Sequence, residues 1–268
     1  MRLSPEAVAA GFSLREYASL DSTNDEAMRA ARVGAPGLLW IVAGAQTGGR
    51  GRLGRAWASP PGNLYASLLL IDPAPAARCA ELGFVAGVAL AQATRALAGG
   101  DERLRLKWPN DLMFGDAKLS GMLLESTRLP DGRLACVVGC GVNCRSHPSG
   151  LAYPTTDLST VLDRNVSAAE VFARLSARMA DALVEWRGGA GFARIRQDWL
   201  ALAHGLNRPL RARLHRGEVT GLFQSIDEAG RLILLTDTGP VTVEAGDIFP
   251  IHDTGAPGAA GQRHMING

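Results

Sequence analysis

The residue types with the clearest chemical potential are concentrated in one stretch, AQTGGRGRLGRAW, which runs from Ala45 to Trp57. It holds four glycines, three arginines and no acidic residue. Glycines let backbone N–H groups approach an anion closely, and each guanidinium can bind two oxygens of a phosphate or carboxylate. The stretch therefore predicts an anion-binding loop. Because it has little apolar surface to bury, we expect it to become ordered when its ligand binds.

The two lysines are the second chemical signal. Of the 28 basic residues, all but Lys107 and Lys118 are arginine. A GC-rich coding sequence, indicated by the abundant Ala, Gly and Arg, explains why lysine is scarce. A compact ammonium on a flexible stem is not interchangeable with a planar guanidinium. The two lysines therefore indicate positions at which arginine would not serve.

Three other interpretations of the loop can be weighed. Its string Gly49–Gly54 fits the dinucleotide fingerprint G-x-G-x-x-G, but Pro60 and Pro61 follow where that fingerprint needs a helix. The Walker pattern is absent, because the sequence contains no Gly-Lys-Ser/Thr. A solvated, arginine-rich loop or a nucleic-acid-binding segment remains the plain alternative from local composition.

The cysteines predict core packing and not a metal site. Cys136, Cys140 and Cys144 are spaced C-x3-C-x3-C, with His147 nearby. The first two fall on one face of an apolar strand, where reduced cysteine is a common small core residue. Structural zinc sites usually have paired C-x2-4-C ligands, which this sequence lacks.

The whole chain has the composition of a globular protein. Its 268 residues are 47% hydrophobic and 20% charged, with a formal charge of +2. No run approaches the roughly 18 apolar residues of a membrane span, and no secretory signal is present. We therefore expect a soluble cytoplasmic protein with no membrane partner. The length suits one large domain plus a small one.

The elements that position these residues can be read from apolar runs and breakers. Strands of buried character, 38–43 and 64–71, flank the loop. Thr23 and Glu26 fit a capping box for a helix over 21–33, and the polar residues there could equally bind a ligand. Further along, we predict a core helix over 79–97, strands over 104–108, 112–114, 118–125 and 134–142, and helices over 166–187 and 191–202. The tight turns between the strands favour a mixed or antiparallel sheet.

The last part of the chain has a different pattern of apolar residues. Short alternating runs at 210–215, 219–226, 232–235 and 241–244 predict a small SH3-like β-barrel. The resulting division is a main domain over 1–205, a barrel domain over 206–252 and a disordered tail over 253–268. The fold class is α+β, with a mixed or antiparallel sheet, helices and the small C-terminal barrel.

Five motifs in order make the sequence resemble the biotin–protein ligases. They are Ser22-Thr23-Asn24; Gln46 with GRGRLGRAW; Lys107-Trp108-Pro109-Asn110-Asp111; Lys118-Leu119-Ser120-Gly121; and Gly139-Cys140-Gly141-Val142-Asn143. The resemblance covers roughly residues 15 to 250 and implies a catalytic domain of class II synthetase-like fold. Leu53 departs from the pattern, where many members carry another arginine. The resemblance is to the monofunctional members, which lack an N-terminal DNA-binding domain and do not bind DNA.

The resemblance implies an ATP-dependent reaction in two steps. Biotin and ATP, with Mg²⁺, form biotinyl-5′-AMP and pyrophosphate, and a lysine of a biotin carboxyl carrier protein then receives biotin. The first step brings two anions together, so fixed positive charge should dominate catalysis. The implied catalytic residues are Lys118, Arg50, Arg52 and Arg55. The three arginines should fold over the adenylate phosphates and exclude water.

The resemblance also implies two binding sets. The biotin set is Ser22, Thr23, Asn24, Gln46, Gly49, Arg50, Gly51, Arg52, Trp108, Lys118 and Gly121. The ATP and adenylate set is Arg52, Arg55, Trp57, Asn110, Asp111, Lys118 and Asn143, and Asp111 is the candidate Mg²⁺ ligand. Core packing for Trp57 and Trp108, and a turn role for Asn143, are the alternatives.

Two other functions stay open from the sequence. A lipoate ligase or octanoyltransferase would share the fold and chemistry, although the GRGRLGR loop and the WPND turn favour biotin. A non-enzymatic RNA-binding module would need exposed aromatics among the arginines. The C-terminal segment has only Phe223 and Phe249 as aromatics. The protein could be a monomer or a homodimer.

Overall fold

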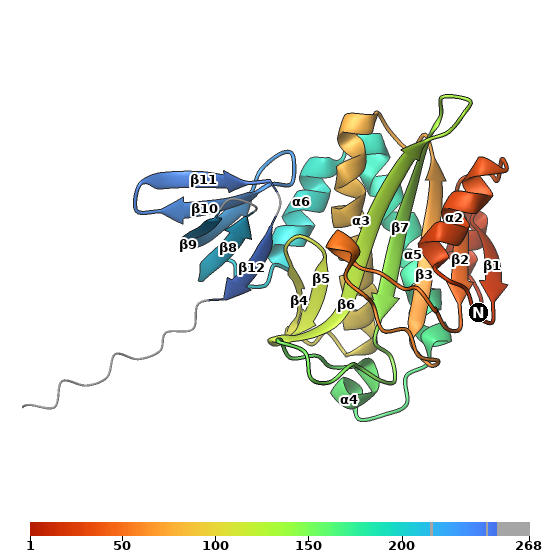
Figure 1. Cartoon of the computed structure of the whole chain (residues 1–268), viewed down its shortest axis with the longest axis horizontal. Coiled ribbons are helices and arrows are strands. Elements are labelled where there is room, and N and C mark those ends of the chain that lie inside the picture. Colours follow the sequence, from red (N-terminus) through yellow and green to blue (C-terminus); the bar gives the residue numbers. More distant parts are fainter. Residues whose placement is uncertain (215–216, 245, 251–268) are drawn as a thin grey trace, which may run out of the picture.

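The computed structural model describes residues 1–214, 217–244 and 246–250. It consists of a large sheet covered by helices, with a smaller sheet beside it (Figure 1). The α+β class predicted from the sequence is confirmed. The predicted tail, 253–268, lies outside the described residues, and the domain limits remain a prediction.

The large sheet has seven strands in the order β1-β2-β3-β7-β6-β5-β4. Strands β1 and β2 are parallel, and every other neighbouring pair is antiparallel. The sheet is therefore mixed, as expected. Its strands are β1 (Ser13–Tyr17), β2 (Leu39–Ala43), β3 (Leu64–Ile71), β4 (Leu104–Lys107), β5 (Asp111–Phe114), β6 (Ala117–Arg128) and β7 (Leu134–Val142).

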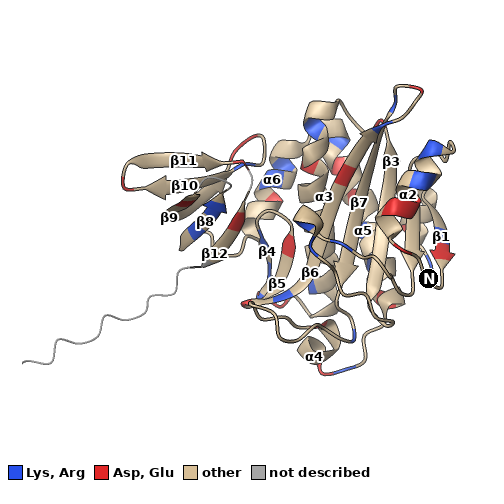
Figure 2. Cartoon of the chain, viewed as in Figure 1, with Lys and Arg blue, Asp and Glu red and all other residues tan. Residues whose placement is uncertain are grey.

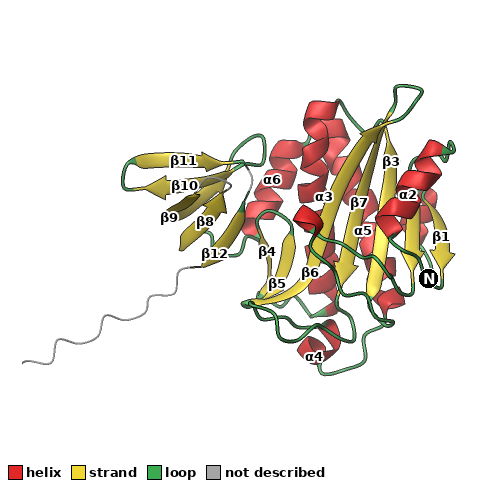
Figure 3. Cartoon of the chain, viewed as in Figure 1, coloured by secondary structure: helices red, strands yellow, loops and turns green. Residues whose placement is uncertain are grey.

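Helices cover both faces of this sheet (Figure 3). Helix α2 (Thr23–Arg32) packs on one face, against β2, β3 and β7. Helices α3 (Leu82–Leu97), α5 (Ala168–Trp186) and α6 (Phe192–Ala201) form the layer on the other face. Short helices α1 (Pro5–Ala9) and α4 (Leu158–Leu162) lie at its margins. Because both faces are covered, the central strands are buried on both sides, which explains their continuous apolar runs.

Strand β3 shows how alternation divides the core. Leu64 and Leu68 point toward α3 and α5 and belong to the main hydrophobic cluster. Leu69 belongs to the second cluster, under α2. Successive side chains of a strand point to opposite faces, so Tyr65 and Ser67 also face the α2 side. Polar residues on that side are therefore brought near the N-terminus of α2.

One segment of the described residues, Ala76–Leu97, is long and apolar enough to cross a membrane by length and composition. It comprises a 3₁₀ segment (Ala76–Glu81) and α3. In the fold, 67% of its most apolar window is buried. Its hydrophobicity is thus used in packing against the sheet and α5.

The second sheet has five antiparallel strands in the order β11-β10-β9-β8-β12. The predicted small C-terminal β-domain is confirmed. Its strands are β8 (Pro209–Leu214), β9 (Gly217–Ile226), β10 (Leu232–Thr236), β11 (Gly239–Val243) and β12 (Asp247–Pro250). It is joined to the first part by hydrogen bonds from Trp108 Nε1 to the Gly230 carbonyl (3.0 Å) and from Arg196 Nε to the Ile226 carbonyl (2.6 Å).

Of two local predictions, the one for the start of α2 is wrong and the one for the cysteines is confirmed. The capping box of Thr23 and Glu26 is wrong, because the N-cap of α2 is Ser22, whose hydroxyl accepts from Asp25 N. All four cysteines are buried and free, as the core interpretation predicted. Burial raises the pKa of Cys140 to about 12, which keeps this thiol protonated.

Candidate active site

Two adjoining cavities lie where the glycine–arginine loop, residues 45–57, crosses the α2 side of the sheet. The inner cavity lies between α2, β6, β7 and the loop and measures about 810 Å³ when the solvent at its mouth is included. The outer cavity lies between β4, β5 and strands β8 and β12 of the small sheet and measures about 1280 Å³ on the same basis. The two share a wall formed by Arg52, Arg55, Asn110, Asp111, Lys118, Tyr153 and Asp247. A molecule with two unlike ends could occupy both.

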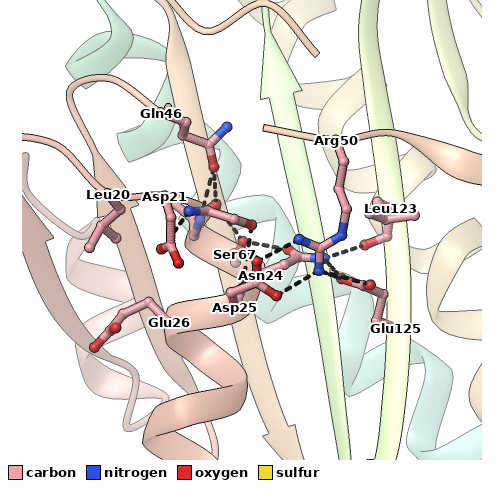
Figure 4. A network of polar contacts seen from close by, with 12 residues as sticks. Leu20, Asp21, Asn24, Asp25, Glu26, Gln46, Arg50, Ser67, Leu123 and Glu125 are labelled. Atoms are coloured by element: carbon pink, nitrogen blue, oxygen red, sulfur yellow. Dashed lines mark hydrogen bonds and ion pairs between the residues drawn. The ribbon is translucent and has the colours of Figure 1, made fainter. Parts of the chain in front are cut away.

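The inner cavity borders a polar network in which uncharged side chains adjoin the ion pairs of Arg50 (Figure 4). Gln46 Oε1 accepts from Thr23 N at 2.8 Å and from the Thr23 hydroxyl at 3.1 Å. The Ser67 hydroxyl donates to Asn24 Oδ1 at 2.6 Å. These residues come from the first turn of α2, the start of the loop and the middle of β3. Such a network offers donors and acceptors at fixed positions to a small polar ring.

Two glycines of β7 make room for this arrangement. A Cβ added at Gly139 would lie 2.3 Å from Asn24 Oδ1, and one added at Gly141 would lie 2.6 Å from Trp57 Nε1. Both glycines face the α2 side, like their partners in the β3–β7 register, Ser67 for Gly139 and Tyr65 for Gly141. The side chains of Asn24 and Trp57 therefore occupy the space that larger residues at these two positions would fill.

A β-bulge in β6 directs Lys118 into the shared wall. The register between β5 and β6 shifts so that Leu112 pairs with Ser120 while Met113 pairs with Lys118. The extra residue, Leu119, is fully buried in the main core. A bulge reverses the alternation beyond it, so Lys118 points to the same face as Gly121. A Cβ added at Gly121 would accordingly lie 3.5 Å from Lys118 Nζ.

Lys118 is surrounded by groups suited to a functional cation. Its Nζ lies 2.7 Å from Asp111 Oδ1 and 17% of its side chain is exposed. The rings of Trp57 and Tyr153 have their centroids at 5.4 and 5.8 Å from Nζ. The ammonium therefore stands at the junction of the cavities, with access to both.

The three arginines of the loop do not point to one place. Arg50 turns toward α2 and β6, where its guanidinium is 2.7 Å from Asp25 Oδ1 and 3.0 Å from Glu125 Oε1 (Figure 4). Hydrogen bonds to Asp25 raise the pKa of Arg50. Arg55 pairs with Asp247 of the small sheet. The loop is thus held from both sides.

Arg52 differs from its two neighbours. Its Nη1 donates to Asn110 Oδ1 and to the Gly246 carbonyl, both at 3.4 Å. Among the described residues it has no carboxylate within 4 Å. Burial lowers the pKa of its guanidinium, which stays charged at neutral pH because the usual value is so high. Arg52 is therefore available to an incoming anion.

Most of the site residues predicted from the sequence meet in the inner cavity. Its lining includes Ser22, Thr23, Asn24, Gln46, Arg50, Gly51, Arg52, Arg55, Trp57, Asn110, Asp111, Lys118 and Gly121. Three predicted residues lie elsewhere: Gly49, Trp108 and Asn143. Trp108 is 3% exposed and borders the outer cavity. Asn143 is buried, with its Nδ2 donating to the Thr156 carbonyl at 3.0 Å.

Gly49, within the loop, packs against the C-terminal end of the loop without lining the cavity. A Cβ added there would lie 2.5 Å from Ser59 Oγ and 2.7 Å from the Trp57 carbonyl. Its role in the structure is close packing. The structure also adds residues that the sequence did not single out, namely Asp25, Tyr65, Ser67, Leu123, Glu125, Tyr153 and Asp247. The sequence did contain a signal for Glu125. It lies four residues after Gly121 in a predicted strand, and residues an even number apart on a strand share a face.

The site can be tested for Mg²⁺ from its donors. Among the described residues no group of three or more His, Cys, Asp or Glu could hold a metal by itself. Asp111 lines both cavities, and its buried Oδ1 has no hydrogen bond of good geometry besides its ion pair with Lys118. Mg²⁺ is often held by one or two carboxylates together with substrate phosphates. Asp111 fits that mode.

Comparisons with known proteins agree with this geometry. Residues 18–143 match the model of the biotin/lipoate A/B protein ligase family. Residues 205–249 match the biotin protein ligase C-terminal domain. The fold and site therefore define a ligase of this class.

Individual relatives show to which members of this family the chain is similar. The chain is 37% identical to a biotin–[acetyl-CoA-carboxylase] ligase of Paracoccus denitrificans, covering 87% of this chain and 98% of the relative. It is 30% identical to the bifunctional ligase/repressor BirA of Bacillus subtilis, with coverage of 85% and 71%. Biotin protein ligase from Aquifex aeolicus, in complex with biotin and ATP, superposes with a TM-score of 0.77 at 27% identity, covering 89% of this chain and 99% of that one. The chain belongs to the biotin protein ligase family, and it is an enzyme of the biotin–[acetyl-CoA-carboxylase] ligase type.

Proposed function

We propose that this chain joins biotin to ATP at the junction of the two cavities and transfers the biotinyl group to a biotin carboxyl carrier protein. Biotin occupies the inner cavity and ATP the outer one. The observation that carries the proposal is the position of Lys118. Its ammonium lies in the shared wall, where the carboxylate of one substrate would meet the α-phosphate of the other.

Inner-cavity chemistry suits biotin better than a lipoyl or octanoyl chain. The cavity lining includes amide and hydroxyl groups from Gln46, Thr23 and Asn24, and the buried Ser67 is hydrogen-bonded to Asn24. The ureido ring of biotin has a carbonyl and two N–H groups that can form hydrogen bonds with this network, whereas a fatty acyl chain can form none with it. A hydrogen bond to a ligand contributes about 0.5–1.5 kcal/mol, so the network favours biotin over acyl chains.

In the first step a carboxylate oxygen of biotin attacks the α-phosphorus of ATP. A P–O bond to the β-phosphate breaks, and pyrophosphate leaves with its electron pair. Lys118 and Arg52 offset the negative charge on the oxygens as the two anions approach. For this Lys118 must exchange its pairing with Asp111 for the substrate oxygens. Mg²⁺ would supply further charge neutralisation at the phosphates, with Asp111 as its protein ligand.

In the second step the ε-amine of a carrier lysine attacks the carbonyl carbon of biotinyl-5′-AMP. The bond to the phosphate oxygen breaks, AMP leaves, and the nitrogen loses a proton to form the amide. The glycine–arginine loop covers the anhydride between the steps and limits its hydrolysis. Support for this role comes from its position across both cavities, anchored by Arg50 on one side and Arg55 on the other.

Exchange of labelled pyrophosphate into ATP tests the proposal. We expect exchange that requires biotin, followed by AMP release and carrier modification when a biotin carboxyl carrier domain is added. Exchange that requires lipoate or octanoate would assign the chain to the related ligases. Binding of RNA without any exchange would contradict both.

A further inference from the structure

The outer cavity contains a histidine that the reaction described above does not use. His204 lies in the linker between α6 and β8 and lines this cavity, with 17% of its side chain exposed. Its backbone is fixed: His204 N donates to the Leu106 carbonyl at 2.7 Å, and Leu106 N donates to the Leu202 carbonyl at 2.8 Å. The imidazole therefore has a defined position next to β4.

The charges around this histidine favour a polyanion. The lining of the outer cavity includes five cations, Arg52, Arg55, Lys107, Lys118 and Arg211, and three carboxylates, Asp111, Asp116 and Asp247. Lys107, at the end of β4, has no carboxylate within 4 Å among the described residues. Figure 2 shows the basic segments of the loop, of β4 and of β8. A cavity with excess positive charge between two parts of the chain suits the phosphates beyond the α-phosphate.

We propose that His204 binds the pyrophosphate end of ATP and takes up a proton from solvent as it does so. This inference rests on the proposed function, because it places ATP in the outer cavity. The neutral imidazole can donate one hydrogen bond, and the imidazolium can donate two and adds a positive charge. Its Nε2 lies 3.3 Å from Asp116 Oδ1, an exposed carboxylate that supports the charged form.

The groups facing His204 set the direction of the pH effect. Burial lowers the pKa of its imidazole, Lys107 and Arg105 act in the same direction, and Asp116 opposes them. Arg211 of β8 and Asp247 of β12 line the same cavity. His204 is thus mainly neutral at pH 7 without ligand. Phosphate oxygens raise its pKa, so affinity for ATP should fall as the pH rises through the pKa of the complex.

A titration by NMR tests the proton uptake directly. The ring signals of the five histidines are followed against pH without and with saturating inorganic pyrophosphate, and His204 is assigned from its absence in His204→Gln. We expect the pKa of His204 to rise on pyrophosphate binding. His147, paired with Asp157 at 2.6 Å and outside both cavities, serves as the internal control. An unchanged pKa for His204 with pyrophosphate bound would overturn the proposal.

Kinetics give an independent readout. In biotin-dependent exchange, KM for ATP should rise with pH between the pKa of free His204, which burial lowers, and the pKa of the complex, by about tenfold for each unit that separates the two. His204→Gln should flatten this rise and leave KM for biotin unchanged. Asp116→Asn should move the rise to lower pH. If His204→Gln shows normal exchange and an equally steep rise of KM with pH, the role of His204 is contradicted and the proposed function is not. If the parent protein shows no exchange, both are contradicted.

Discussion

At the scale of single residues, the site depends on which cations are already neutralised. Arg50 and Arg55 are paired with carboxylates, so a ligand gains little from them without breaking those pairs. Arg52 and Lys118 line both cavities, and among the residues that the structure describes Lys118 is paired with Asp111 alone. The four implied catalytic cations thus divide into two that anchor the loop and two that can contact the reacting atoms.

Lys118→Arg tests whether a point charge is required. The guanidinium is planar and wider than an ammonium, and Gly121 and Trp57 confine the space around Nζ. We expect adenylate formation to fall by about 10²–10³ while the circular dichroism spectrum is unchanged. Arg128→Lys, at the far end of β6, is the matched control and should retain full activity. Adenylation by Lys118→Arg at the parent rate would exclude Lys118 as the central cation.

At the scale of elements, β7 shapes the inner cavity because two of its residues on that face are glycines, which have no side chain. Gly139→Ala should cost about 1–3 kcal/mol in the free energy of unfolding, since the added Cβ would collide with Asn24. In an Asn24→Ala background the collision is absent, so the same substitution should cost much less. Urea unfolding of the four proteins in this cycle measures the difference. Equal costs in the two backgrounds would mean that Gly139 serves another purpose.

The glycine–arginine loop was expected to become ordered on ligand binding, and this remains a prediction. In the structure, Gly51 N donates to the Arg55 carbonyl at 2.7 Å, and Leu53 is 82% exposed with φ of 56°. The tip of the loop is therefore held by polar contacts of its backbone, Arg52 and Arg55, and its one large apolar side chain, Leu53, is not packed. Trypsin should cut after its arginines in the free protein, and biotin with ATP should slow that cleavage at least about tenfold. Cleavage after Arg133, in the β6–β7 turn, should not change.

The sequence predicted most elements of the sheet and most of the residues lining the inner cavity. Strands β3 and β7 were predicted with their observed limits, because apolar runs between breakers are clear local signals. Strands β1 and β12 were missed, because β1 is a mostly exposed edge strand and β12 is only 4 residues long. The bulge at Leu119 was also missed, and it decides where Lys118 points. Bulges depend on the pairing of two strands, which local sequence does not show.

At the scale of the whole molecule, the small sheet completes the outer cavity. Asp247 and Phe249 of β12 and Arg211 of β8 line it opposite β4 and β5. The position of the small sheet depends on the β9–β10 turn, where Gly230 accepts the hydrogen bond from Trp108. Nucleotide binding should therefore depend on contacts far from the reacting atoms.

Gly230→Ala tests this dependence. The added Cβ would lie 2.4 Å from Phe84 Cε2, so the turn and the small sheet must shift away from α3. Gly132→Ala is the matched control: φ is +88° there and +78° at Gly230, but nothing lies within 4 Å of its Cβ. Both substitutions carry the strain of a positive φ, about 1–2 kcal/mol. Only Gly230→Ala should also raise KM for ATP several-fold while KM for biotin, bound in the inner cavity, stays constant. If the two variants have the same KM for ATP, the outer cavity does not depend on how the small sheet is docked.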